Sequence, residues 1–220
     1  MKEFGTIEDF ELLLEEAHKR GFKLIMDLVV NHTSDEHEWF KKECEKKEEV
    51  SQDFYIWEKT PPNHWESYFG GPAWEYDSTR QMYYLHLFSK KQPDLNWENP
   101  YVRKKIYEMM NWWIDKGIDG FRMDVINLIS KTPGFPEGRQ IPDTPYTEKS
   151  PYVVCGPRMH EYLKEMNREV LCGHNLFTVG EGLGLTVEQA REITDEKAGE
   201  LQMMFNFEHV TVEALSLIHI

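Results

Sequence analysis

The stretch Lys-Leu-Ile-Met-Asp-Leu-Val-Val, residues 23–30, is a nearly continuous apolar run with the length of one strand. Such a run is typical of a strand in a parallel sheet that is buried on both faces. The residues before it form an amphipathic helical pattern, which begins with a capping box at Thr6 and Asp9 and ends at Gly21. His32 lies just past the carboxyl end of the run. The stretch therefore predicts one helix–strand unit.

The same unit recurs three more times along the chain. A helix starting at Asn99 precedes a strand at 120–126, a helix at 158–171 precedes a strand at 176–180, and a capped helix from Thr186 precedes a strand at 201–207. Strands that alternate with helices imply a parallel sheet, either doubly wound or closed into a barrel.

Residues 33–98 break this pattern. They are rich in aromatic and turn-forming residues, and a connection of this length is expected to be functional or to form a small subdomain. Its aromatic residues could form a subdomain core or a wall on which sugars stack; they are Trp65, Tyr68, Phe69, Trp74, Tyr83, Tyr84 and Phe88. Both roles stay open. A second long segment, 132–157, is studded with proline.

The composition limits the partners. A net charge of −14 disfavours nucleic acid and anionic membranes, because an acidic surface repels phosphate. The three cysteines, Cys44, Cys155 and Cys172, include no Cys-x-x-Cys pair, which indicates free thiols in a reducing compartment. The sequence shows no apolar run of the roughly 20 residues that cross a membrane, and no signal-peptide pattern at its start. We expect a cytoplasmic protein.

Each predicted strand carries an acid in or just after its carboxyl half: Asp27, Asp124, Glu181 and Glu208. In a (β/α)₈ barrel, catalytic residues gather at this end of different strands. An acid can also simply begin a loop, and this reading stays open for Glu208. Asp27 lies within its strand, so we expect it to anchor a neighbour by hydrogen bonds.

Arg122 and Asp124 lie two residues apart on one strand, so their side chains project from the same face. A guanidinium beside a carboxylate favours the charged carboxylate, which suits a nucleophile or the stabiliser of a cationic transition state. A structural ion pair would explain the two residues equally well.

Glu181 lies between Gly180 and Gly182 at the end of another strand. The glycines leave room for a substrate, and apolar surroundings would raise the pKa of this carboxyl toward that of a general acid. Together, Glu181 and Asp124 supply the pair of carboxylates that glycoside hydrolysis needs. His32 alone could be structural or bind a ligand, and His37 does not complete a His-x-x-x-His zinc pattern, so no metal site is expected.

Four short blocks resemble, in order, the sequence blocks of the α-amylase family. They are Asp-Leu-Val-Val-Asn-His (27–32), Gln-Pro-Asp-Leu-Asn (92–96), Gly-Phe-Arg-Met-Asp-Val (120–125) and Gly-Glu (180–181). The resemblance runs from about Phe4 to about Thr211. It implies a partial (β/α)₈ TIM barrel with about four of the eight strands, formed by residues 1–32 and 99–214. Residues 33–98 would be the family's inserted domain B, which walls one side of the site.

The resemblance also implies roles for individual residues. Asp124 would attack the anomeric carbon and form a covalent intermediate, and Glu181 would act as acid and then as base. Arg122 would position Asp124, and His32 would hydrogen-bond the sugar. Phe88 and Gln92 would line the same pocket. An oligosaccharide is the implied substrate and no cofactor is needed, although a calcium ion stays open for a longer protein.

Two stretches, 35–40 and 88–99, resemble the oligo-1,6-glucosidase branch of the family. In that branch a valine after the nucleophile accompanies cleavage of α-1,6 linkages, and this chain has Val125. One methyl group controls only about 1–3 kcal/mol of selectivity. Trehalose-6-phosphate hydrolase, α-1,4-glucosidase and isomaltulose synthase are therefore kept as alternatives. A non-catalytic relative is disfavoured, because the two acids and Arg122 are present.

Some family features find no match in this sequence. The third carboxylate, a His-Asp pair on a later strand, is missing, and so are the two opening strands. We expect this chain alone to be inactive and its barrel unable to close, whereas the full-length protein is expected to be a monomer. The last six residues, 215–220, read like a translated sequencing adapter, so the biological sequence is expected to stop near Ala214.

Overall fold

The computed structural model describes residues 5–45 and 53–207 of the chain. The acid Glu208 and the tail at 215–220, both singled out in the sequence, lie outside the described residues.

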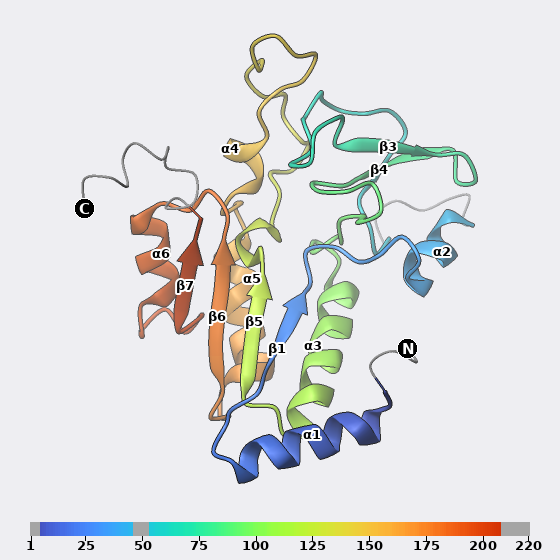
Figure 1. Cartoon of the computed structure of the whole chain (residues 1–220). Coiled ribbons are helices and arrows are strands. Elements are labelled where there is room, and N and C mark those ends of the chain that lie inside the picture. Colours follow the sequence, from blue (N-terminus) through green and yellow to red (C-terminus); the bar gives the residue numbers. More distant parts are fainter. Residues whose placement is uncertain (1–4, 46–52, 208–220) are drawn as a thin grey trace, which may run out of the picture.

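Four parallel strands form the main sheet, in the order β1 (Ile25–Val29), β5 (Gly120–Asp124), β6 (Phe177–Gly182) and β7 (Met203–Asn206). All their carboxyl ends point the same way, upward in Figure 1. The parallel sheet predicted from the repeated helix–strand units is confirmed. Its register places Asp27 opposite Arg122 and Glu181 opposite Phe205.

The helices that alternate with these strands begin and end close to the predicted residues. They are α1 (Ile7–Lys19), α3 (Pro100–Asp115), α5 (Met159–Met166) and α6 (Val187–Thr194), and α5 continues as a π-helical turn, Asn167–Leu171. Thr6 and Asp9 form the predicted capping box of α1, which satisfies backbone N–H groups that the first turn leaves free. Asn99 caps α3, whose first residue is proline.

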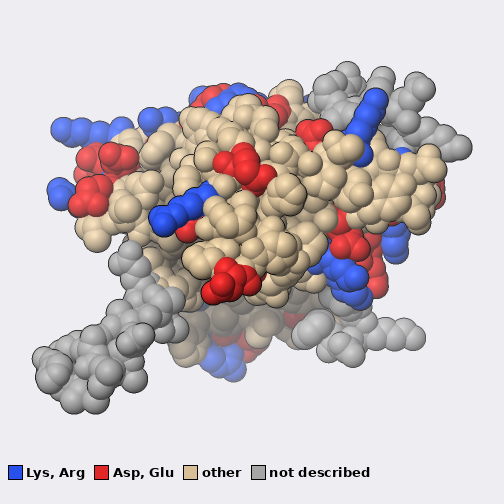
Figure 2. Space-filling view, turned by 90° about the horizontal axis from the view of Figure 1, so that it is seen from above, with Lys and Arg blue, Asp and Glu red and all other residues tan. Residues whose placement is uncertain are grey.

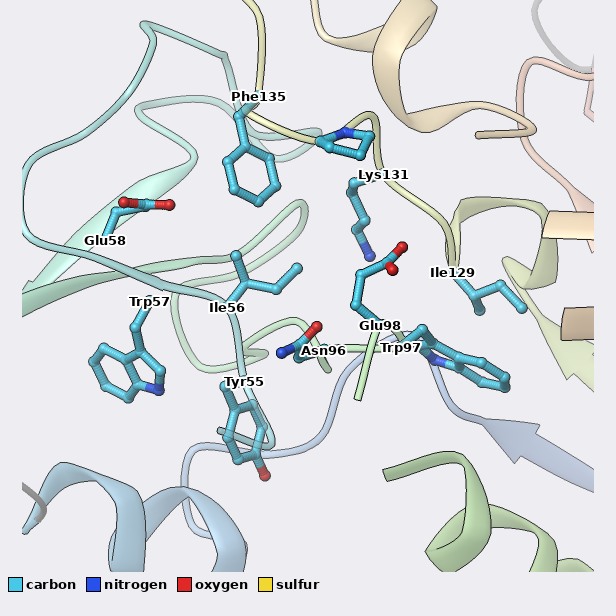
Figure 3. Close-up of a pocket in the computed structure, with 11 residues that line it drawn as sticks. Tyr55, Ile56, Trp57, Glu58, Asn96, Trp97, Glu98, Ile129, Lys131 and Phe135 are labelled. Carbon is cyan, nitrogen blue, oxygen red and sulfur yellow. The ribbon is translucent and has the colours of Figure 1, made fainter. Parts of the chain in front are cut away.

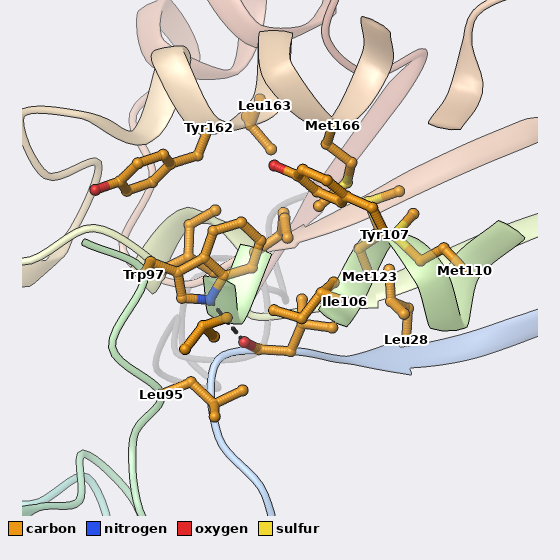
Figure 4. Packing of buried hydrophobic residues seen from close by; sticks show 14 of the residues in the cluster. Leu28, Leu95, Trp97, Ile106, Tyr107, Met110, Met123, Tyr162, Leu163 and Met166 are labelled. Carbon is orange, nitrogen blue, oxygen red and sulfur yellow. Dashed lines mark hydrogen bonds between the residues drawn. The ribbon is translucent and has the colours of Figure 1, made fainter. Parts of the chain in front are cut away.

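One face of the sheet is packed against α3 and α5 (Figure 4). Leu28 and Met123 point into this layer, and Phe121 belongs to the same cluster; all three are almost fully buried. Trp97 closes one end of it, and its indole N–H donates to the Val30 carbonyl oxygen at 2.8 Å. Burial of each such side chain contributes roughly 1.5–3 kcal/mol, so this layer holds the sheet to its helices.

The opposite face of the sheet is open. Val29 is 43% exposed and Met203 is 49% exposed, and Ile25, Phe177 and Phe205 on the same face are exposed as well. The expectation that the strand at 23–30 is buried on both faces is therefore wrong for the described residues. The reason is that the helices among them cover the sheet from one side only, as α5 does behind the sheet in Figure 1.

The segment between β1 and α3 contains helix α2 (Glu38–Cys44) and a small antiparallel sheet above the main one. Its strands are β2 (Trp57–Glu58), β4 (Met82–Leu85) and β3 (Trp74–Asp77), in that order across the sheet. The core of this sheet also includes Val125, Leu128 from the 3-10 helix η1 (Ile126–Leu128), and Val153 from α4 (Ser150–Val153). The insertion therefore packs directly on the residues that follow β5.

The proline-rich segment 132–157 joins this second core. The indole N–H of Trp65 donates to the Pro136 carbonyl oxygen at 3.0 Å, and Trp65 also forms a β-bridge with Thr147. Seen from above, charged side chains of both signs lie among uncharged ones over the insertion and the strand ends (Figure 2). No helix within the described residues is long and apolar enough to span a membrane.

Candidate active site

Arg122 lies at the centre of a cluster of acids on the open face of the sheet. Its Nη1 atom lies 2.7 Å from Oδ1 of Asp27 and 2.7 Å from Oδ1 of Asp124, and its Nη2 atom donates to Glu181. Asp124 is two residues along the same strand, and Asp27 and Glu181 come from the strands on either side. Strand alternation and parallel register thus bring the three carboxylates to one guanidinium. Asp27 anchors its neighbour as predicted.

Glu181 is the most enclosed acid of this cluster, with 9% of its side-chain surface exposed. Burial raises the pKa of this carboxyl, Arg122 opposes the rise, and the charge of Asp124 adds to it. A carboxyl with a raised pKa holds a proton closer to neutral pH than an ordinary one does, as a general acid must.

Arg122 itself stays charged. Burial by itself would lower the pKa of the guanidinium, but hydrogen bonds to Asp27 and Asp124 and the charge of Glu181 outweigh burial and raise it. The ring of Phe205 on β7 lies 5.8 Å from the guanidinium carbon and covers it from another side. Nothing in the sequence pattern singled out Phe205, because its contact with Arg122 depends on the register of strands far apart in the chain.

His32 lies three residues past the end of β1 and is buried. Burial lowers its pKa, which favours the neutral ring, although Asp94 and Asp124 oppose this effect. Its Nε2 atom lies 3.1 Å from Nε2 of Gln92, and its ring centroid lies 5.3 Å from that of Phe88. A neutral imidazole can donate or accept a hydrogen bond at a sugar hydroxyl.

These groups surround one open cavity of about 440 Å³, within the roughly 300–1,000 Å³ of small-molecule sites. The predicted site residues that line it are His32, Phe88, Gln92, Asp124, Val125 and Glu181. Arg122 is not among the lining residues, although it pairs with both acids. The lining also includes Tyr68 and Phe69, which were assigned above to either a core or a wall, and Leu183, which the sequence did not indicate.

Some aromatic residues of the insertion lie in a core, and others line the cavity as a wall; the sequence had left both roles open. Trp65, Trp74 and Tyr84 are buried and belong to the core, whereas Phe69 is 71% exposed at the edge of the cavity. Tyr68 and Phe88 are half-buried and stack on each other, with ring centroids 5.1 Å apart. Their faces form the aromatic wall of the cavity.

A buried polar network behind the wall was not predicted. The Lys131 ammonium lies 2.8 Å from Oδ2 of Asp94 and donates to Oδ1 of Asn31 at 2.8 Å, and the Asn31 amide donates to Asp94 at 3.1 Å. Burial lowers the pKa of Lys131, and Asp94 opposes that shift. Asn31 and Asp94 flank His32 and Gln92 in the chain, so this network fixes the backbone that positions both. Lys131 itself lies outside the family blocks.

Val125, directly after Asp124, has a left-handed backbone conformation with φ 36° and ψ 41°. This conformation is strained for a β-branched residue, at a cost of order 1–3 kcal/mol. The side chain is buried in the second core, and this packing holds the backbone in place. The strain therefore falls at the point where the chain turns away from the two acids.

A second, smaller cavity of about 230 Å³ lies between the insertion and residues 129–135 (Figure 3). Apolar side chains such as Ile56 and Phe135 dominate its lining, and Glu58 and Glu98 contribute carboxylates. Neither Asp124 nor Glu181 reaches it.

Among the described residues, no group of His, Cys, Asp and Glu side chains is arranged to hold a metal ion, and all three cysteines have free thiols.

A parallel sheet that alternates with helices, and whose strand ends bring two acids into one cavity, is the arrangement of a TIM-barrel glycosidase. Residues 1–217 match the family described as "Alpha amylase, catalytic domain". The chain belongs to the α-amylase family of glycoside hydrolases, which confirms the resemblance seen in its four blocks and the predicted partial barrel.

The relatives of this chain include members of the oligo-1,6-glucosidase branch, which the sequence had indicated. The chain is 57% identical over 217 residues to the oligo-1,6-glucosidase of Halalkalibacterium halodurans, covering 97% of this chain and 39% of that protein. It is 54% identical over 210 residues to the glucan 1,6-alpha-glucosidase of Streptococcus pneumoniae, covering 96% of this chain and 36% of that protein. The chain thus spans about two fifths of the length of these curated relatives.

A solved structure is similarly close. The trehalose-6-phosphate hydrolase of Bacillus licheniformis superposes with a TM-score of 0.88 at 52% sequence identity, covering 95% of this chain and 38% of that one. The four-stranded sheet and the insertion described above are therefore arranged as in a glycosidase of this family.

Proposed function

We propose that this chain is the central part of a retaining, exo-acting α-glucosidase that removes terminal α-1,6-linked glucose from isomalto-oligosaccharides. The observation that carries the proposal is the placement of Asp124 and Glu181 on one guanidinium, in a cavity with an aromatic wall. Relatives named oligo-1,6-glucosidase and glucan 1,6-alpha-glucosidase support the α-1,6 linkage. We refer to the longer protein as the full-length enzyme.

The reaction proceeds by two displacements. Asp124 attacks the anomeric carbon while Glu181 gives its proton to the departing glycosidic oxygen, which leaves a glycosyl ester on Asp124 and a charged Glu181. Glu181 then takes a proton from water as the water oxygen attacks the same carbon, and Asp124 leaves as a carboxylate. The burial that raises the pKa of Glu181 supports the first of these steps. Arg122 positions Asp124, and His32 and Gln92 bind sugar hydroxyls.

The domain division is part of the same proposal. Residues 33–98 would act as domain B, and residues 1–32 and 99–214 as part of the barrel. The open face of the sheet, with Asp124 and Glu181 on it, would be the barrel interior. Further strands of the full-length enzyme would cover this face and supply a third carboxylate, so this chain alone is proposed to be inactive.

Trehalose-6-phosphate hydrolase is the second candidate, favoured by the similarity to the solved structure of that activity. The cavity lining argues for a neutral sugar, because the described residues that form it include no lysine or arginine to pair with a phosphate. An α-1,4-glucosidase would share the two acids and differ in the shape of the pocket around Val125.

The full-length enzyme tests these alternatives when isomaltose, maltose and trehalose 6-phosphate are compared as substrates. We expect kcat/KM to be highest for isomaltose. A preference for maltose would contradict the linkage and leave the mechanism standing, and a preference for trehalose 6-phosphate would favour the second candidate.

We also propose that the full-length enzyme is a cytoplasmic monomer that needs no cofactor. The free thiols of Cys44, Cys155 and Cys172 support a reducing compartment. Size-exclusion chromatography with light scattering tests the monomer, and activity after treatment with a chelator tests the absence of a metal requirement.

A further inference from the structure

A lysine outside the cavity lies against an aromatic ring that lines it. The ammonium of Lys149 lies 3.6 Å from the centroid of the Tyr68 ring. Tyr68 in turn stacks on Phe88 with an angle of 27° between the ring planes, and both rings line the cavity that contains Asp124 and Glu181. The aromatic wall therefore has a cation among its contacts, within the distance at which ammonium groups bind aromatic faces.

The segment that carries Lys149 is fixed to the insertion close to Tyr68. Lys149 belongs to the proline-rich segment 132–157, which is tied to the insertion through the β-bridge between Trp65 and Thr147. The N–H of Glu66 donates to the Thr147 carbonyl oxygen at 3.1 Å, and the N–H of Thr147 donates to the His64 carbonyl oxygen at 2.8 Å. These backbone bonds fix Lys149 next to the part of the insertion that carries Tyr68.

Lys149 is a desolvated cation. Only 8% of the residue is exposed. Burial lowers the pKa of its ammonium to about 8, and the carboxylate of Glu66 opposes that shift from a distance. A cation that has lost most of its water binds an aromatic face more strongly than an exposed one does. The environment of Lys149 thus strengthens its contact with Tyr68.

We propose that Lys149 is a positioning residue for the sugar cavity: it holds the Tyr68 ring against Phe88 and so fixes the aromatic wall that the substrate contacts. This inference rests on the proposed function. Lys149 acts through Tyr68 and touches neither acid, so its removal should weaken sugar binding and leave the chemical step nearly unchanged.

The test compares Lys149→Met and Lys149→Arg in the full-length enzyme. Methionine keeps an unbranched apolar side chain and removes the charge, whereas arginine keeps the charge. We expect Lys149→Met to raise KM for isomaltose, and the inhibition constant of glucose, by roughly three- to thirtyfold. We expect kcat to stay within about twofold. Lys149→Arg should restore most of the lost affinity.

A matched control is Lys116→Met. Lys116 also lies over an aromatic ring, 5.3 Å from the centroid of Trp112, but at the carboxyl end of α3 and away from the cavity. We expect this variant to change neither KM nor kcat. If KM rises in Lys149→Met and not in Lys116→Met, the effect is specific to the aromatic wall of the cavity.

The pH dependence of KM distinguishes a role of the Lys149 charge from a purely structural role of the side chain. KM of the unmodified enzyme should rise as pH passes through about 8, where Lys149 loses its charge. Burial raises the pKa of the Tyr68 hydroxyl to about 12, so the ring that faces Lys149 stays uncharged over this range. Lys149→Arg should abolish this rise, because guanidinium stays charged.

An unchanged KM in a folded Lys149→Met variant would overturn the proposal. If that variant does not fold, Lys149→Gln decides, since it also removes the charge and keeps an unbranched side chain. A rise in KM is then expected as well, and no rise would overturn the proposal. A full-length enzyme without activity on any α-glucoside would instead contradict the proposed function, and with it any substrate role for Lys149.

Discussion

The two faces of the four-stranded sheet differ in almost every physical respect although they are built from alternating residues of the same strands. Phe121 and Met123 point to the helix side, where they are fully buried among apolar neighbours. Arg122 and Asp124 point to the other side, where charges of opposite sign meet beside an open cavity. The contrast teaches that one face of each strand maintains the fold and the other is available for chemistry.

The largest expected effect lies on the open face. Asp124→Asn in the full-length enzyme removes the proposed nucleophile, so kcat on isomaltose should fall by roughly 10⁴-fold or more. The melting temperature should change little, because the helix side is untouched. Steady-state kinetics and a thermal melt measure both. Activity near the unmodified level would show that Asp124 is not the nucleophile.

The next effect lies on the helix side. Phe121→Ala leaves a cavity in the packed layer and should lower the free energy of unfolding by about 3–5 kcal/mol. Val29→Ala, on the open face and 43% exposed in this chain, is the matched comparison in the full-length enzyme, where further strands are proposed to cover this face. A clear loss of stability at Val29 is expected there, and no loss would contradict the proposed covering.

The pH dependence of activity follows from the protonation of Glu181. Its folded pKa is raised, so the protonated acid persists to higher pH than an ordinary carboxyl and is lost as pH rises through that value. On the alkaline side, kcat for isomaltose should fall about tenfold per pH unit once Glu181 is mostly ionised. Glu181→Gln should abolish this dependence, and a limb that persists in the variant would assign it to another group.

The smallest effect concerns the exposed end of the ion cluster. The side chain of Asp27 is 60% exposed, and exposed ion pairs contribute about 0.2–1 kcal/mol. Asp27→Asn should therefore lower stability by no more than this and reduce kcat by less than about tenfold. Salt titration of the melting temperature checks the assignment, because screening should weaken the contribution of Asp27 in the unmodified protein. A loss as large as that of Asp124→Asn would place Asp27 in the chemistry itself.

Local patterns were enough to predict the four helix–strand units and the shared face of Arg122 and Asp124. Alternation within 120–125 placed Arg122 and Asp124 on one face, and the capping signals at Thr6, Asn99 and Thr186 marked the helix starts. These inferences depend on residues only a few positions apart, where backbone geometry is the same in every protein.

The structural features that the sequence did not predict depend on contacts between residues that are far apart in the chain. Lys131 meets Asp94, and Lys149 meets Tyr68, only after the insertion has packed against residues 131–157. The left-handed backbone of Val125 has no local cause, because valine disfavours it and only the surrounding core holds it. The exposure of the open face likewise depends on which elements lie above it rather than on the apolar run at 23–30.

Trapping the covalent intermediate tests the central claim most directly. Incubation of the full-length Glu181→Gln variant with 5-fluoro-α-D-glucosyl fluoride should let the first displacement occur, since fluoride leaves without a proton, and should slow the second, which needs a base. Peptide mass spectrometry should then find one glucosyl adduct, on Asp124, and none in an Asp124→Asn control. An adduct on Asp27 or on any other acid would contradict the account.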